Sequence, residues 1–197
     1  MTDQQLDLIT LAGSTRKASV NKKLARLARD RARHAGASVE FLDLADYPLP
    51  LYDGDLEDRE GIPAAAQELK ARLRQCDGFL IASPEYNSSL SPVLKNALDW
   101  ISRRKDADEP PLAAYRGKVA ALVAASPGGL GGLRGLVPLR MMLGNIGVHV
   151  IPDQFALAGA FDAFNDADEL ADPKQAEQLS TVVEAWVATA ARLKQHG

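Results

Sequence analysis

The sequence contains a single cysteine, Cys76, among its 197 residues. One thiol excludes both an intrachain disulfide and a cysteine-based metal cage, and the three histidines are too widely spaced for a metal site. No run reaches the ~18 consecutive apolar residues that a membrane span needs. The polar N-terminus, "MTDQQ", also lacks the basic and apolar regions of a signal peptide. These absences predict a cytoplasmic protein with neither a bound metal nor a membrane segment.

The chain also lacks a strong excess of charge of either sign. Its net charge is -3, so no bulk field draws it toward nucleic acid or an anionic membrane. Apolar residues make up 46% of the chain and charged residues 25%, which is typical of a globular protein with a sizeable core. At this length we expect one domain that covers residues 1–197.

Apolar runs of strand length alternate along the chain with longer segments of helical pattern. Strands are predicted at 6–12, 38–44, 78–83, 118–126 and 148–152. Helices are predicted at 20–35, 63–75, 92–102, 133–145 and 173–195. The strands are nearly all apolar, as expected for a parallel sheet that is covered on both faces. The pattern predicts a doubly wound α/β fold, in which ligands bind at the carboxyl ends of the strands.

The loop after the first strand, "AGSTRKASVN" (12–21), is rich in hydrogen-bond donors. A helix start favours acidic residues because the helix dipole is positive there, yet this one carries several cations, namely Arg16, Lys17, Lys22 and Lys23. Backbone N–H groups and a guanidinium suit a phosphate, as do the side chains of Ser14, Thr15, Ser19 and Asn21. The alternative is a serine N-cap followed by a solvated basic turn. The loop matches neither GxxxxGK[ST] nor GxGxxG, which favours a monophosphate.

Two further loops follow the third and fourth predicted strands. The segment "SPEYNSSLSP" (83–92) offers polar groups that suit the edge of a planar heterocycle, and its alternative role is a polar turn that caps the next helix. The segment "SPGGLGGLRG" (126–135) has five glycines, which let a backbone pass close to a ligand. A flexible connection explains these glycines nearly as well. Arg134 and Arg140 follow, either as surface residues or as contacts to another subunit.

No catalytic side chain stands out in the sequence. Ser14 lies in a GST triplet rather than in GxSxG, and no histidine is placed to activate a serine. The aspartates and glutamates are scattered or lie in loops, so no carboxylate pair shares a helix face. The pattern is that of a protein that positions a ligand at three strand ends.

Three segments resemble the motifs of one known family, in the same order and at the expected separations. "GSTRKASVNKKLA" resembles GSxRxxSxNxxLA, and "PEYNSSLSPVLKNALDW" resembles PEYNxSxxxxLKNAxDW. "SPGGLGGLRGLVPLRMMLGNIGVHV" resembles the third, glycine-rich region, which is less specific. The resemblance is to the flavodoxin-like NADPH-dependent FMN reductases and spans residues 6 to about 155. Many relatives have Pro-Gly where this chain has Ser91-Pro92, and we expect from this only a small change in loop shape.

The resemblance implies a flavodoxin-like three-layer sandwich, with a five-stranded parallel sheet of order 2-1-3-4-5, helices on both faces and FMN across the strand ends. It assigns the FMN phosphate to the amides around Val20 and to Ser14, Arg16, Ser19 and Asn21. It assigns the frame of the isoalloxazine ring to Pro84, Glu85, Tyr86 and Asn87. The other side of the ring is approached by Ser126 and by the backbone of Pro127, Gly128 and Gly129.

The resemblance also implies an enzyme in which hydride passes from NADPH or NADH to FMN and on to a small-molecule acceptor. The acceptor is a quinone, an azo compound, chromate or a free flavin, and FMN itself carries the chemistry. Homodimers or homotetramers are implied as well. The helix 92–102 has apolar stripes that suit the sheet, a partner subunit or both, formed by Val93, Ala97 and Trp100 and by Leu94, Leu98 and Ile101.

Three other functions are compatible with parts of the sequence. A flavin-binding electron carrier usually has a strongly acidic surface, which a net charge of -3 does not supply. A sensor or interaction module without cofactor is disfavoured by intact Arg16, Asn21 and PEYN. A different phosphorylated ligand is compatible with the first loop alone. Residues 45–62 are predicted as a long acidic loop that shapes acceptor access. Candidates for a 2'-phosphate clamp are Arg103, Arg104, Arg116 and Lys118.

Overall fold

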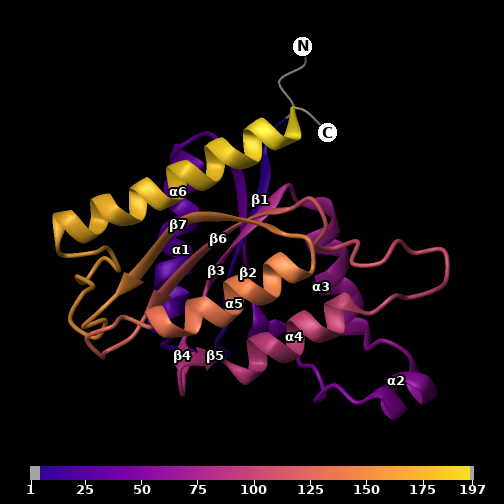
Figure 1. Ribbon diagram of the computed structural model, residues 1–197. Helices are drawn as coiled ribbons and strands as arrows, with labels where there is room; N and C mark the ends of the chain where they lie inside the picture. The colour runs from indigo at the N-terminus through magenta and orange to yellow at the C-terminus, as the bar shows by residue number, and fades with distance from the viewer. Residues whose placement is uncertain (1–4, 196–197) are drawn as a thin grey trace.

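The computed structural model describes residues 5–195, so residues 1–4 of the polar N-terminus and His196 lie outside it. A five-stranded parallel sheet forms the centre of the fold, in the order β2-β1-β3-β6-β7 (Figure 1). Its strands are β1 (Asp7–Ala12), β2 (Ser38–Asp43), β3 (Gly78–Ala82), β6 (Val119–Ala125) and β7 (His149–Leu157). Numbered along the sheet-forming strands alone, this is the predicted order 2-1-3-4-5, and the prediction is confirmed.

Helices cover both faces of the sheet, which makes three layers (Figure 1). One face carries α1 (Val20–His34) and α6 (Pro173–Lys194). The other face carries α3 (Ala64–Gln75), α4 (Pro92–Ser102) and α5 (Leu133–Asn145). No helix within residues 5–195 combines the length and the apolarity that crossing a membrane requires. The fold is therefore the flavodoxin-like α/β sandwich that the sequence predicts.

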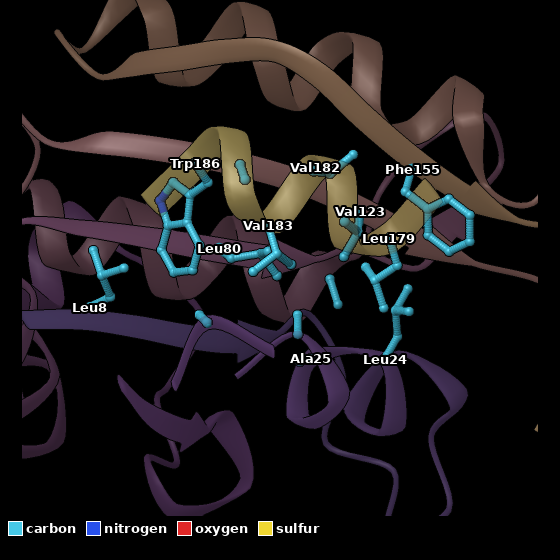
Figure 2. Close-up of a cluster of buried hydrophobic side chains, with 14 of the residues drawn as sticks. Leu8, Leu24, Ala25, Leu80, Val123, Phe155, Leu179, Val182, Val183 and Trp186 are labelled. Carbon is cyan, nitrogen blue, oxygen red and sulfur yellow. The ribbon is translucent and has the colours of Figure 1, made fainter. Parts of the chain in front are cut away.

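Successive residues of each central strand enter different hydrophobic clusters. In β3, Leu80 packs in the cluster beneath α1 and α6, whereas Phe79 and Ile81 pack in the cluster beneath α3, α4 and α5. Figure 2 shows the first cluster, in which Leu24 of α1 and Trp186 of α6 lie with the strand side chains. Because both faces are buried, the strands read as continuous apolar runs rather than as alternating ones.

The strand β7 extends five residues beyond its predicted end at residue 152. Its pairing with β6 shifts register, since Ala120 pairs with Val150 but Leu122 pairs with Gln154. Pro152 and Asp153 lie within this irregularity and are exposed. They interrupt the apolar pattern, which is why the sequence underestimates the strand. Such bulges are typical of edge strands, where one side of the ladder is open.

The predicted loop 45–62 begins within the short helix η1 (Leu44–Asp46) and contains α2 (Gly54–Glu60), which lies at the periphery of the molecule (Figure 1). Its middle is fixed to α4, because the side chains of Asn96 and Trp100 both donate hydrogen bonds to the Pro50 carbonyl at 2.8 Å. Trp100 is fully buried there. The apolar stripes of α4 are thus used within the chain, with Leu94, Ala97, Leu98, Trp100 and Ile101 all buried.

Cys76 follows α3 and is only 4% exposed. Burial removes hydration from the thiolate and raises the pKa of the thiol to about 12. Because the thiolate is the reactive form, we expect the native protein to resist a thiol reagent such as DTNB at pH 8. One equivalent should react once guanidinium unfolds the chain. Rapid stoichiometric labelling of the folded protein would contradict this packing.

Candidate functional site

The three predicted loops meet at the carboxyl edge of the sheet. They are the first loop (13–19, after β1), the second loop (83–91, after β3) and the third loop (126–132, after β6). The Gly13 N–H donates to the Ala82 carbonyl at 2.9 Å, and the Ser91 hydroxyl donates to the Gly13 carbonyl at 2.5 Å. Ser91 also accepts from the Leu94 N–H as the N-cap of α4, which confirms that the second loop caps this helix.

Asn21 joins the first turn of α1 to the end of β6. Its side-chain amide donates to the Ala125 carbonyl at 2.8 Å, and its side-chain oxygen accepts from the Ala125 N–H at 2.9 Å. The residue is 2% exposed. The side chain is therefore committed to the scaffold, and a contact from Asn21 to a phosphate would have to come from its backbone amide.

Two of the cations at the start of α1 are neutralised within the chain. Lys22 is buried and pairs with Asp43 at 2.6 Å, at the end of β2. Lys23 pairs with Asp168 at 2.5 Å. These two lysines therefore give no support to a bound phosphate, because carboxylates distant in sequence supply their counter-charge.

Arg16 and Lys17 differ from those lysines. Both are exposed, and neither forms a side-chain hydrogen bond or ion pair with any of residues 5–195. The Ser14 hydroxyl accepts from the Arg16 N–H at 3.3 Å, which shapes the turn. The first backbone hydrogen bond of α1 runs from the Lys23 N–H to the Ser19 carbonyl. The N–H groups of Val20 and Asn21 precede it and therefore have no acceptor within the helix. This donor set fits a phosphate.

The second loop is a small hairpin that the sequence pattern does not reveal. Its strands are β4 (Glu85–Tyr86) and β5 (Ser89–Leu90), which pair antiparallel. Asn87 and Ser88 form the turn with positive φ angles of 52° and 64°. Both turn residues are exposed, and Tyr86 is 53% exposed. A polar tip and an aromatic side chain are therefore presented outward at the carboxyl edge.

Glu85 connects this hairpin to the third loop. Its carboxylate accepts from the Arg134 N–H at 3.0 Å and from the Gly135 N–H at 3.3 Å, and it pairs with the Arg134 guanidinium at 2.6 Å. Helix α5 begins after Gly132, which has no side chain to cap it. The Glu85 side chain, 8% exposed, caps it instead. The sequence suggests Glu85 as a ring contact, whereas its carboxylate holds two loops together.

The five glycines of the third loop and the start of α5 fall into two groups. A Cβ on Gly131 would lie 2.7 Å from the Ala156 backbone, and one on Gly132 would lie 2.9 Å from the Ala124 side chain. A Cβ on Gly135 would also be crowded, at 3.0 Å from the Ser89 carbonyl. These three glycines are explained by packing. Gly128 and Gly129 are exposed and uncrowded, since a Cβ on Gly128 would make only an ordinary contact with Ser126 at 3.7 Å and one on Gly129 would meet nothing, so these two are free to face a ligand.

Three of the four candidates for a 2'-phosphate clamp, Arg103, Arg104 and Lys118, are engaged elsewhere, and so is Arg140. Arg103 pairs with Glu57 at 2.8 Å, and Arg104 donates to carbonyls of its own loop. Lys118 donates to the Arg74 carbonyl at the amino edge of the sheet, opposite the site. Arg140 donates to the Ile151 carbonyl beside the irregularity in β7. None of these side chains is placed to clamp a phosphate at the carboxyl edge.

Comparison with known proteins identifies the family of the chain. Residues 6–162 match the family described as NADPH-dependent FMN reductase. The chain is 36% identical over 194 residues to the "Probable NADPH:quinone oxidoreductase 2" of Oryza sativa subsp. japonica, covering 96% of this chain and 91% of the rice protein. It is 41% identical over 141 residues to the "Quinone reductase" of Escherichia coli K12, covering 71% and 70% of the two chains.

A solved structure is similar over the same length. The flavoenzyme NAD(P)H:(acceptor) oxidoreductase FerB from Paracoccus denitrificans superimposes with a TM-score of 0.80 at 28% identity, covering 98% of this chain and 99% of FerB. The matched region contains all three loops and the sheet that carries them. The chain belongs to the NADPH-dependent FMN reductase family, and it is an NAD(P)H-dependent flavin oxidoreductase that uses FMN.

Proposed function

We propose that residues 1–197 form one cytoplasmic FMN-binding domain that reduces quinones at the expense of NAD(P)H. Quinones are favoured over azo compounds, chromate and free flavin because the rice and Escherichia coli relatives carry quinone reductase names. Membership of a reductase family disfavours a simple electron carrier or a sensor without cofactor. The observation that carries the proposal is an unneutralised Arg16 beside the free amides of α1, at the carboxyl edge of the sheet.

The phosphate end of the site is formed by the first loop. The Arg16 guanidinium supplies the charge, while the amides around Val20 and Asn21 and the hydroxyls of Ser14 and Ser19 supply directed donors. Ser14 and Ser19 are buried, at 7% exposure each, and their hydroxyls are held in position because they accept from the Arg16 and Lys22 N–H groups. Because Asn21 is anchored to Ala125, its amide direction is set before any ligand arrives.

The ring end lies between the second and third loops. Tyr86 and Asn87 project from the hairpin, and Pro84 is buried beneath it. Ser126 accepts from the Gly128 N–H at 3.3 Å, which holds the exposed backbone from Pro127 to Gly129 in one shape. Bound FMN supplies the two-electron chemistry between nicotinamide and acceptor. The protein's part is to bind, orient and leave open one face for both substrates.

Replacing Arg16 with alanine should weaken FMN binding by about 1.5–3 kcal/mol, because one charge-assisted hydrogen bond to the phosphate is lost. Flavin fluorescence quenching during titration of the apoprotein measures this affinity. Arg192→Ala, an exposed arginine near the end of α6, removes the same charge away from the site and should leave the affinity unchanged. Equal FMN affinity in wild type and the Arg16 variant would refute the phosphate assignment.

Replacing Glu85 with alanine should lower the free energy of unfolding by about 0.5–2 kcal/mol, because the start of α5 loses its cap. Glu85→Gln keeps one acceptor oxygen and should cost less. Arg134→Ala should change stability by only about 0–1 kcal/mol, since its side chain is 60% exposed. Urea unfolding monitored by circular dichroism gives all three values. A larger loss for Arg134→Ala than for Glu85→Ala would show that the ion pair, not the cap, matters.

The homodimer implied by the family resemblance is supported by one exposed face of α5. Three apolar side chains follow one another there at helical spacing, namely Leu133, Val137 and Met141, and Leu130 of the third loop precedes them. All four remain 39% to 65% exposed. Scattered apolar residues are normal on a surface, but an aligned row is typical of an interface. The α5 face, rather than the apolar stripes of α4, is the candidate contact with a partner subunit, because those stripes are buried within the chain.

Val137→Glu should shift the protein to a smaller species, because a desolvated charge at the centre of the row opposes association. Size-exclusion chromatography with light scattering measures the mass. Leu193→Glu is the matched control on α6, at 40% exposure. An oligomer that survives the Val137 change, or a monomeric wild type, would exclude this interface.

A further inference from the structure

A pocket of about 280 Å³ lies beside the first loop, on the side away from the third loop. Thr15 contributes one wall, residues 44–49 contribute a second, and the first turns of α4 contribute a third. Most of the lining is apolar or aromatic, including Tyr47, Leu49 and Val93. The pocket shares no lining residue with the sites proposed above for the FMN phosphate and ring.

The walls of this pocket are fixed by hydrogen bonds. The Asn96 amide donates to the Pro50 carbonyl, and its oxygen accepts from the Tyr52 N–H, both at 2.8 Å. Trp100 donates to the same Pro50 carbonyl. Residues 50–52, which follow the lining segment 44–49, are thus held to α4 by hydrogen bonds. A pocket that is formed in advance binds a flat apolar group without paying to order its walls.

Two unpaired cations directly follow, in sequence, a residue that lines the pocket. Thr15 is followed directly by Arg16 and Lys17, the two exposed cations of the carboxyl edge that have no partner among residues 5–195. Arg16 is assigned to the FMN phosphate, which leaves Lys17 available for a second anion. Asp46 lies in the wall segment but is exposed and is not part of the lining.

We propose that this pocket binds the adenosine half of NADPH, with Lys17 holding the 2'-phosphate. A quinone has no charge to match Lys17, whereas the adenosine half combines a flat base with a phosphate. A donor whose nicotinamide reaches the flavin ring would run past the first loop to this pocket. The inference rests on the proposed function, since it places the donor relative to bound FMN.

The direct test is calorimetric titration of the FMN-loaded protein with 2',5'-ADP and with 5'-AMP. Wild type should bind 2',5'-ADP more tightly than 5'-AMP. Lys17→Ala should weaken 2',5'-ADP by about tenfold or more through loss of a charge-assisted bond, with little effect on 5'-AMP. Lys174→Ala is the matched control, because Lys174 is an exposed lysine in the first turn of α6. Equal affinity of Lys17→Ala and wild type for 2',5'-ADP would overturn the assignment.

A second variant tests the pocket itself. Val93→Trp fills it from the α4 side and should weaken both fragments, and Leu49→Trp does the same from the opposite wall. FMN content and melting temperature, measured on the same samples, show whether each variant is folded and loaded. The pocket assignment is overturned if Val93→Trp and Leu49→Trp are both folded and loaded with FMN and still bind the two fragments as tightly as wild type does.

Steady-state kinetics separate this proposal from the proposed function. Lys17→Ala should lower kcat/KM for NADPH through KM while changing the value for NADH less than about twofold. If the protein binds FMN and oxidises NADPH but binds neither fragment, the pocket proposal fails and the reductase stands. If no FMN binds to the folded protein, the proposed function fails, and the donor subsite fails with it.

Discussion

The site depends on the pairing of the Asn21 carboxamide with the backbone of Ala125. A residue at the end of a buried central strand has an N–H and a carbonyl that the sheet no longer satisfies, and leaving either unpaired costs about 1–3 kcal/mol. Asn21 satisfies both, at 2.9 and 2.8 Å, from a position 104 residues away. The start of α1 is thereby held over the end of β6. The bonds from Ser91 to Gly13 and from Glu85 to α5 act likewise, so buried polar side chains hold all three loops in register.

The fold could be predicted because its determinants are local. Strands buried on both faces are mostly apolar, and β1, β3 and β6 have this pattern, with polar residues, glycine or proline on either side. The order of the strands came from the family resemblance rather than from periodicity. What was missed has physical reasons. The hairpin at 85–90 has strands of only two residues, which are too short to give a pattern. Helix α2 buries no side chain and so has no apolar stripe. Pro152 interrupts the apolar run of β7, so the second half of that strand was not predicted.

The three loops lie at the carboxyl edge of the sheet, as the sequence predicts, but the partners of their side chains were only partly predictable. The motifs assign Glu85 and Asn21 to the site and the charge pattern adds Lys22, yet their partners are Arg134, Ala125 and Asp43, which are 49, 104 and 21 residues away. Long-range pairing of this kind has no periodic signal. The same applies to Gly131, whose need for a missing Cβ is set by the backbone of β7. Arg16 and Lys17 become distinctive only once every other nearby cation is seen to be paired.

The irregular pairing of β7 has a consequence for how the molecule meets other copies of itself. A long, regular edge strand offers unpaired N–H and carbonyl groups that can recruit a strand from another chain. Here Pro152 has no N–H to offer, Asp153 places a charge on the rim, and Arg140 occupies the Ile151 carbonyl. Edge-to-edge addition is thus blocked at the centre of the strand. The sheet stops at five strands, and this edge offers little open backbone to a sixth strand from another chain.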